Sequence, residues 1–134
     1  MSAQNKSIGV ANTTTSCKYI TFPYDANTVT QKIFTASQKC VVTDIRGATR
    51  VAGSGGACTF DFWKAASGVA VASGTKLNTT TFDIAGTADT NQVVSLVALP
   101  ATVTLAVGDS IGVVLTGTPT SAVGAVTITL EPTS

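Results

Sequence analysis

The side chains that most often do acid–base or metal chemistry are few in this sequence and widely spaced. The 134 residues contain no His and only three Cys, at Cys17, Cys40 and Cys58. A zinc site needs Cys and His ligands at short paired spacings, and no C-x-x-C pair occurs. The cysteines are therefore predicted to be reduced, small core residues, with a Cys40–Cys58 disulfide as the lesser alternative.

Carboxylates are the remaining candidates for catalysis, because glycosidases work with a pair of them. The candidates are Asp61, Asp83, Asp89 and Asp109. Asp109 is expected in a turn, Asp89 in a loop and Asp61 on the polar face of a strand. There is also no phosphate-binding loop of the Walker type and no Cys–His pair. We therefore predict a protein that is not an enzyme, with no catalytic, cofactor-binding or metal-binding residue.

Two polar loops bear a superficial likeness to ligand sites. Residues 86–91 could offer backbone carbonyls to a calcium ion, but they lack the D-x-[DN]-x-[DN]-G run of a calcium loop. Residues 53–56 are rich in Gly, like an anion-binding nest, but a strand rather than a helix is expected after them. Both segments are interpreted as ordinary connections.

Sugar-binding modules present exposed aromatic side chains, and the chain has eight aromatic residues. The candidates for such a platform are Tyr19, Phe22, Tyr24 and Trp63. Packing in the core accounts for most of them, because aromatic side chains bury large areas. Carbohydrate recognition is kept as an alternative.

Charge is low and nearly balanced, with a net charge of +1 and 11% charged residues. A nucleic-acid binder needs clustered Lys and Arg, so no nucleic-acid partner is predicted. The most apolar stretch, residues 93–107, is interrupted by polar residues and is too short to span a bilayer, so no membrane segment is predicted. The basic residues Lys6, Lys18, Arg46 and Arg50 are predicted to face a protein partner, with solvated surface charges as the alternative.

The chain is expected to consist of a flexible N-terminal arm, residues 1–16, and one domain, residues 17–134. The first sixteen residues have almost no large apolar side chains with which to offset the entropy of ordering. The N-terminus also lacks the features of a secretory signal, so the protein is expected to be made in the cytoplasm.

The domain is predicted to be all-β. Short segments with period-two alternation recur about every ten residues, separated by Gly, Asn, Asp, Pro and Ser. Phe60 and Phe62 fall on one face of a strand and Trp63 on the other, while Val126, Ile128 and Leu130 alternate with Thr. About eight or nine strands are expected, forming an antiparallel β-sandwich like a jelly roll. The expected strands cover residues 18–22, 31–36, 39–47, 58–64, 80–84, 92–96, 102–107, 110–116 and 125–130, and a type II′ hairpin turn is expected at Gly108 and Asp109.

Residues 60–75, 86–92, 105–113 and 116–118 resemble small phage virion proteins, particularly the jelly-roll decoration or cement proteins of capsids. The resemblance extends over about residues 29–132 and concerns turns and strand edges. It implies a homotrimer that binds the major capsid protein on the outer surface of the virion head, where it stabilises the shell. The arm would order against the capsid and join neighbouring subunits. The alternative is a trimeric receptor- or carbohydrate-binding module of a tail fibre or spike.

Overall fold

Alternation of apolar and hydroxyl side chains produces the longest strands of the domain. The computed structural model describes residues 18–133. In the C-terminal strand, Val126, Ile128 and Leu130 are buried at 1% exposure or less, while Thr127 and Thr129 lie on the opposite face. In the strand that begins at Thr59, Phe60 and Phe62 are fully buried. These inward faces were predicted from the sequence and are confirmed.

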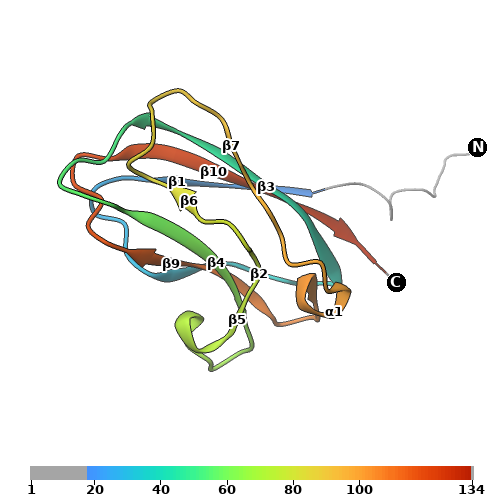
Figure 1. Cartoon of the computed structure of the whole chain (residues 1–134). Coiled ribbons are helices and arrows are strands. Elements are labelled where there is room, and N and C mark those ends of the chain that lie inside the picture. The colour runs from blue at the N-terminus through green and yellow to red at the C-terminus, as the bar shows by residue number, and fades with distance from the viewer. Residues whose placement is uncertain (1–17, 134) are drawn as a thin grey trace, which may run out of the picture.

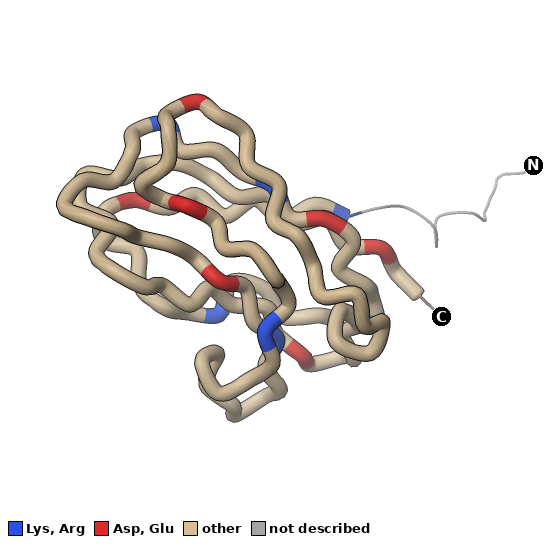
Figure 2. The backbone as a smooth tube through the Cα atoms, in the orientation of Figure 1, with Lys and Arg blue, Asp and Glu red and all other residues tan. Residues whose placement is uncertain are grey.

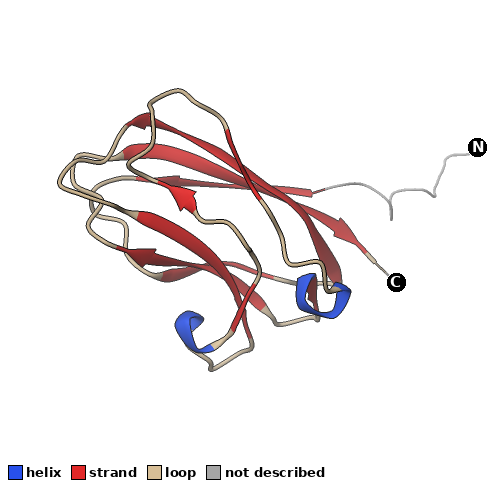
Figure 3. Cartoon of the chain, viewed as in Figure 1, coloured by secondary structure: helices blue, strands red, loops and turns tan. Residues whose placement is uncertain are grey.

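Ten strands and two single-turn helices make up the described chain (Figures 1 and 3). The elements are β1 (Lys18–Tyr24), β2 (Gln31–Thr35), β3 (Cys40–Val51), β4 (Thr59–Ala65), η2 (Val71–Ser73), β5 (Thr75–Lys76), β6 (Phe82–Asp83), β7 (Gln92–Val94), α1 (Pro100–Val103), β8 (Thr104–Leu105), β9 (Ser110–Thr116) and β10 (Val123–Pro132). The predicted all-β class is confirmed, with a strand count close to the one expected.

The strands form two antiparallel five-stranded sheets that pack face to face (Figure 1). Sheet A has the order β1-β10-β3-β7, with β8 pairing to β3, and sheet B has the order β2-β9-β4-β5, with β6 pairing to β4. The chain passes repeatedly from one sheet to the other, as it does in a jelly roll. The architecture is therefore the predicted antiparallel sandwich.

The core lies between the two sheets and is built around aromatic rings. The Tyr24 and Phe60 rings meet edge to face with centroids 5.3 Å apart, and the Phe60 and Phe82 rings stack at 6.5 Å. These are the offset and edge arrangements that aromatic quadrupoles favour. Phe22 meets Phe60 edge to face at 6.2 Å. The N-terminal strand is thereby fixed against sheet B.

One side of the sandwich is closed by the segment of residues 77–80, which lies between β4 of sheet B and β7 of sheet A. The Leu77 N–H donates to the Phe62 carbonyl at 2.8 Å, and the Thr79 N–H donates to the Ser95 carbonyl at 2.8 Å. These bonds join the two sheets along this side through the backbone. On the other side, β1 and β2 end their respective sheets.

The predicted hairpin at Gly108 and Asp109 is wrong. The strands before and after the turn, β8 and β9, belong to different sheets. The Asp109 N–H donates to the Ala106 carbonyl at 3.0 Å, and Gly108 has a φ of +92°, so Gly108 is the third residue of a type II turn. A Gly–Asp pair is compatible with a type II′ hairpin turn and with a type II turn. The pairing of β8 with β3 decides between the two.

The strand expected at residues 80–84 is also shorter than predicted, because β6 has only two residues. The cysteine prediction holds for the described residues: Cys40 and Cys58 are both buried, free thiols. Cys40 pairs with Leu105 near α1, whereas Cys58 precedes β4 at the other end of the sandwich, so the alternative disulfide between them is wrong. Cys17 and the predicted arm, residues 1–16, lie outside the described residues.

Candidate interaction surface

The outward side of sheet A extends across the four strands β1, β10, β3 and β7. Strand register aligns side chains in rows across it: Thr21 lies opposite Thr127, Thr127 opposite Arg46, and Arg46 opposite Val93. We call this surface the outer A face. Its members are Tyr19, Thr21, Pro23, Asp44, Arg46, Ala48, Val93, Ala125, Thr127 and Thr129.

The outer A face combines exposed apolar side chains with hydroxyls and carries no net charge. Tyr19 is 68% exposed and Val93 is 57% exposed. Its two charged residues neutralise each other, because Arg46 Nε donates to Asp44 Oδ2 at 2.7 Å. Such an exposed pair contributes little to stability. Protein interfaces are enriched in Tyr and depleted of unpaired charge at their centres, so the face has the composition of a contact surface.

Three of the basic residues that were predicted to face a partner lie within the described part of the chain, and these three do not form one patch. Charged positions are scattered along residues 18–133 (Figure 2). Lys18 begins β1 opposite Leu130, which in turn pairs with Val42. Arg46 lies four residues after Val42 on β3, and Arg50 lies four residues after Arg46. Each of these steps along the strand spans about 13 Å. Arg50 is the unpaired residue of a β-bulge. Lys6 lies outside the described residues.

A shallow, open hollow of about 340 Å³ adjoins the Arg50 end of the outer A face. Ala48 and Ala125 contribute to its apolar lining, and Arg50 and Asp89 are its charged residues. Asp89 has a φ of 59°, and its N–H donates to the Thr49 carbonyl at 2.7 Å. The hollow extends the small-residue surface of sheet A and brings one cation and one anion to its edge.

Three of the four carboxylates considered for catalysis, those of Asp61, Asp83 and Asp109, accept hydrogen bonds that hold local structure. Asp109 Oδ2 accepts a hydrogen bond from the Ala106 N–H at 3.0 Å and so closes its own turn. Asp83 Oδ1 accepts one from the Ala85 N–H at 3.0 Å. Asp89 lies in the loop before β7, as predicted. Asp61 belongs to β4 and makes the contacts described below.

The four candidate aromatics are divided among three parts of the fold. Tyr24 is 3% exposed, and Phe22 packs against the core. Tyr19 lies on the outer A face, while Trp63 lies on the outward side of sheet B, opposite Gly112. They do not form a shared sugar-binding platform.

The Tyr24 hydroxyl is buried, with Cys58 and Asp83 nearby. Burial and these two neighbours raise the pKa of the hydroxyl above its ordinary range.

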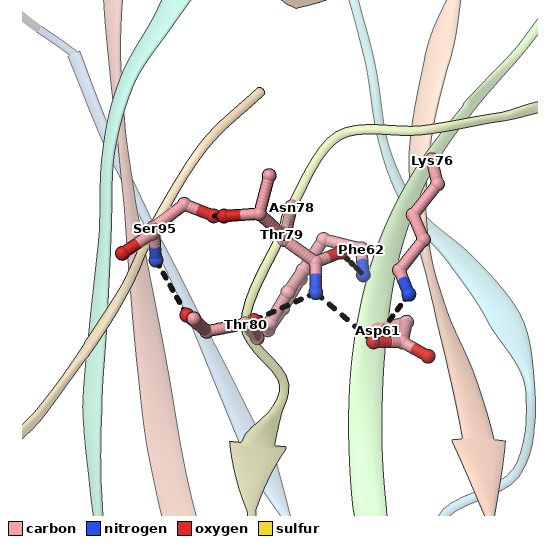
Figure 4. Close-up of polar contacts among 7 residues, drawn as sticks. All are labelled: Asp61, Phe62, Lys76, Asn78, Thr79, Thr80 and Ser95. Atoms are coloured by element: carbon pink, nitrogen blue, oxygen red, sulfur yellow. Dashed lines mark hydrogen bonds and ion pairs between the residues drawn. The ribbon is translucent and has the colours of Figure 1, made fainter. Parts of the chain in front are cut away.

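A buried amide, missed in the sequence, organises the edge of β4 (Figure 4). Asn78 is 2% exposed, and its Oδ1 accepts a hydrogen bond from the Phe62 N–H at 2.8 Å. Its Nδ2 donates to Asp61 Oδ1 at 2.9 Å and to the Thr80 carbonyl at 2.8 Å. Lys76 Nζ lies 3.5 Å from the same Asp61 Oδ1. One carboxylate oxygen therefore contacts both an amine and an amide.

Between residues 18 and 133, no group of three or more His, Cys, Asp or Glu side chains is placed to hold a metal ion. Across the same residues, no helix is long and apolar enough to cross a membrane.

Comparison with known proteins gives one structural likeness. No protein-family model matches the chain, and no curated protein sequence matches it. One solved chain is similar, from a structure described by the words "Bacillus endospore appendages form a novel family of disulfide-linked pili". It is 20% identical in sequence, the alignment covers 92% of this chain and 91% of that one, and the TM-score is 0.40. A likeness at this level carries no argument about what this chain binds or builds.

Proposed function

We propose that this chain is a structural, non-catalytic virion protein that decorates the outer surface of a phage capsid. It acts as a homotrimer, binds the major capsid protein and stabilises the shell. The protein is made in the cytoplasm of the host. This role follows the resemblance of residues 29–132 to jelly-roll decoration proteins.

The observation that carries the proposal is the outer A face. It presents threonine methyls and hydroxyls, exposed Tyr19 and Val93, and a charge pair that is already neutral. A partner chain can bury such a surface without stranding a charge, and stranded charges are what makes burial costly. We assign the outer A face to the contact between subunits of the trimer.

The first test is the solution mass of the purified full chain by light scattering over a range of concentrations. The expected result is a mass near three times 13.5 kDa. A mass of 13.5 kDa at every concentration would contradict a preformed trimer.

The second test concerns location. Phage particles from cells that carry this sequence are purified on a density gradient and labelled with a gold-conjugated antibody raised against the chain. Label over the outer surface of heads is expected. Label confined to tails would instead support the tail-fibre or spike alternative, which a glycan-binding assay on the purified chain would then examine. Particles without label would contradict both virion roles.

A further inference from the structure

Three chemically complementary side chains meet at the edge of β4. Asp61 Oδ1 accepts a hydrogen bond from Asn78 Nδ2 at 2.9 Å and lies 3.5 Å from Lys76 Nζ (Figure 4). An amine, a carboxamide and a carboxylate that touches both are the groups needed to join a lysine to an asparagine through an amide bond. The Lys–Asn pair supplies nucleophile and electrophile, and the carboxylate can carry protons between them.

The Asn78 carboxamide is held in a way that favours attack at its carbon. Its Oδ1 accepts the Phe62 N–H at 2.8 Å, and a fixed backbone donor at this position stabilises the negative charge that develops on the oxygen during attack. Asn78 is 2% exposed and the Asp61 side chain is 16% exposed, so water has little access to the carboxamide. Exclusion of water protects a reactive intermediate from hydrolysis.

Lys76 is the mobile member of the group. Its side chain is 41% exposed, so it can change rotamer without disturbing the core. Lys76 and Asn78 are two residues apart, and side chains at that spacing leave an extended chain on the same side. A rotation that moves Nζ from Asp61 toward the neighbouring Cγ of Asn78 brings the nucleophile to the electrophile.

We propose that Lys76 and Asn78 form an autocatalytic isopeptide bond, with Asp61 as the proton carrier and the Phe62 N–H as the oxyanion donor. Asp61 takes a proton from the Lys76 ammonium, and Nζ attacks Cγ of Asn78. The tetrahedral intermediate then loses a second proton from Nζ. Nδ2 receives this proton and the one that Asp61 took, the Cγ–Nδ2 bond breaks, and Nδ2 leaves as ammonium. Asp61 ends as a carboxylate, and no oxidant or other reactant is needed.

The bond would fix the segment that closes the sandwich. It would link Lys76, at the end of β5, to Asn78. The Asn78 amide is hydrogen-bonded to β4, and the neighbouring Thr79 is hydrogen-bonded to Ser95 before α1. This chemistry is independent of the proposed virion role, because it lies within one chain and on sheet B.

The test is the mass of the intact full chain after prolonged incubation near neutral pH, followed by trypsin mapping. The bonded chain is lighter than its sequence mass by one ammonia. Lys76 is also the last basic residue of the sequence, so trypsin normally separates residues 65–76 from residues 77–134. A bonded Lys76 resists trypsin, and residues 65–134 appear as one peptide that lacks one ammonia.

Matched variants separate this reaction from other chemistry. Lys76→Arg keeps a cation beside Asp61 and is expected to retain the full sequence mass. Asp61→Asn removes the proton carrier and is expected to slow bond formation at least about 100-fold. Asp83→Asn is the control and is expected to react at the wild-type rate. Circular dichroism checks that each variant is folded.

Two results would overturn the proposal. One is a wild-type chain at its full sequence mass with complete cleavage after Lys76. The other is an ammonia loss that persists in Lys76→Arg, because cyclisation of Asn78 with its own backbone gives the same mass change without Lys76.

Discussion

Gly112 lets the connection between β4 and β5 rest on the outward side of sheet B. A Cβ at this position would overlap Cγ2 of Val71 in η2, and it would lie 2.7 Å from the carbonyl oxygen of Gln31 in β2. The Gln31 oxygen belongs to the backbone of a paired strand and cannot easily move. The absence of a side chain here is therefore a packing requirement.

We expect Gly112→Ala to lower the free energy of unfolding by about 1–3 kcal/mol, as overpacking of a filled site does. Urea denaturation measures the change. Gly53→Ala is the matched control, because its Cβ would meet nothing closer than 3.5 Å, and it should change stability by less than about 1 kcal/mol. Equal losses of stability in the two variants would contradict a packing requirement at Gly112.

The two buried thiols make stability depend on pH in the alkaline range. Burial raises the pKa of Cys40 and Cys58 above the usual value of 9.0; Asp83 raises that of Cys58 further, and Lys18 partly opposes the shift at Cys40. The folded state therefore keeps protons that the unfolded chain gives up. Stability is full below the unfolded pKa and falls as pH rises through the folded one, by at most about 1.4 kcal/mol per pH unit for each thiol.

Urea denaturation between pH 7 and 10 tests this prediction. The loss above pH 9 should be smaller in the Cys40→Ala/Cys58→Ala double variant than in the wild type. The comparison concerns slopes, because removal of two buried side chains lowers stability at every pH. Identical slopes would mean that the thiols do not cause the dependence.

At the scale of elements, Lys64 joins the end of β4 to the short helix α1. Its Nζ donates to the Ala101 carbonyl at 2.9 Å and to the Thr104 carbonyl at 3.0 Å. These carbonyls lie in and just after the helix, where the backbone lacks partners of its own and where a cation interacts favourably with the helix dipole. Lys64 is thus a cap that reaches α1 from the other sheet.

Lys64→Met keeps the apolar stem and removes the ammonium. We expect a loss of about 1 kcal/mol, because hydrogen bonds from a charged donor contribute about 1.5–3 kcal/mol when buried and less where solvent reaches them. Faster amide hydrogen exchange at residues 102–105 is the local measurement. Lys39→Met, at an exposed position before β3, should leave that exchange unchanged. Equal protection in wild type and Lys64→Met would contradict the capping role.

Sequence patterns predicted the elements whose side chains alternate without interruption. β4, β9 and β10 were expected within a few residues of their observed bounds, because each pairs along most of its length and buries one face. Residues 75–105 were predicted poorly, since their short strands depend on distant bonds such as Thr79 N–H to the Ser95 carbonyl. The role of Asn78 was missed for the same reason: its partner is the Phe62 backbone, sixteen residues away.

The candidate surface was predictable only in part. The alternation of Thr127 and Thr129 with buried residues indicated a polar outward face on β10. The pairing of Arg46 with Asp44 was not read from the sequence, although residues two apart on a strand share a face. Which strands lie side by side depends on the topology of the whole sheet, and so the rows of the outer A face could not be assembled from local patterns.

At the scale of the whole molecule, the trimer contact can be tested by comparing two exposed valines that lie at separate places. Val93 is 57% exposed on the outer A face, and Val107 is 68% exposed in the turn before β9. The two positions are similar in residue type and exposure, but only Val93 belongs to the surface that we assign to the trimer contact.

We expect Val93→Lys to shift the mass of the chain in light scattering toward 13.5 kDa. A lysine on a contact face must be buried without a partner or must hold the subunits apart, and either cost is several kcal/mol. Val107→Lys should keep the wild-type mass. Both substitutions are at exposed sites and should alter the free energy of unfolding of the isolated chain by no more than about 0.5 kcal/mol. If Val93→Lys associates as the wild type does, another surface joins the subunits; if both variants dissociate, added charge rather than the outer A face explains the loss.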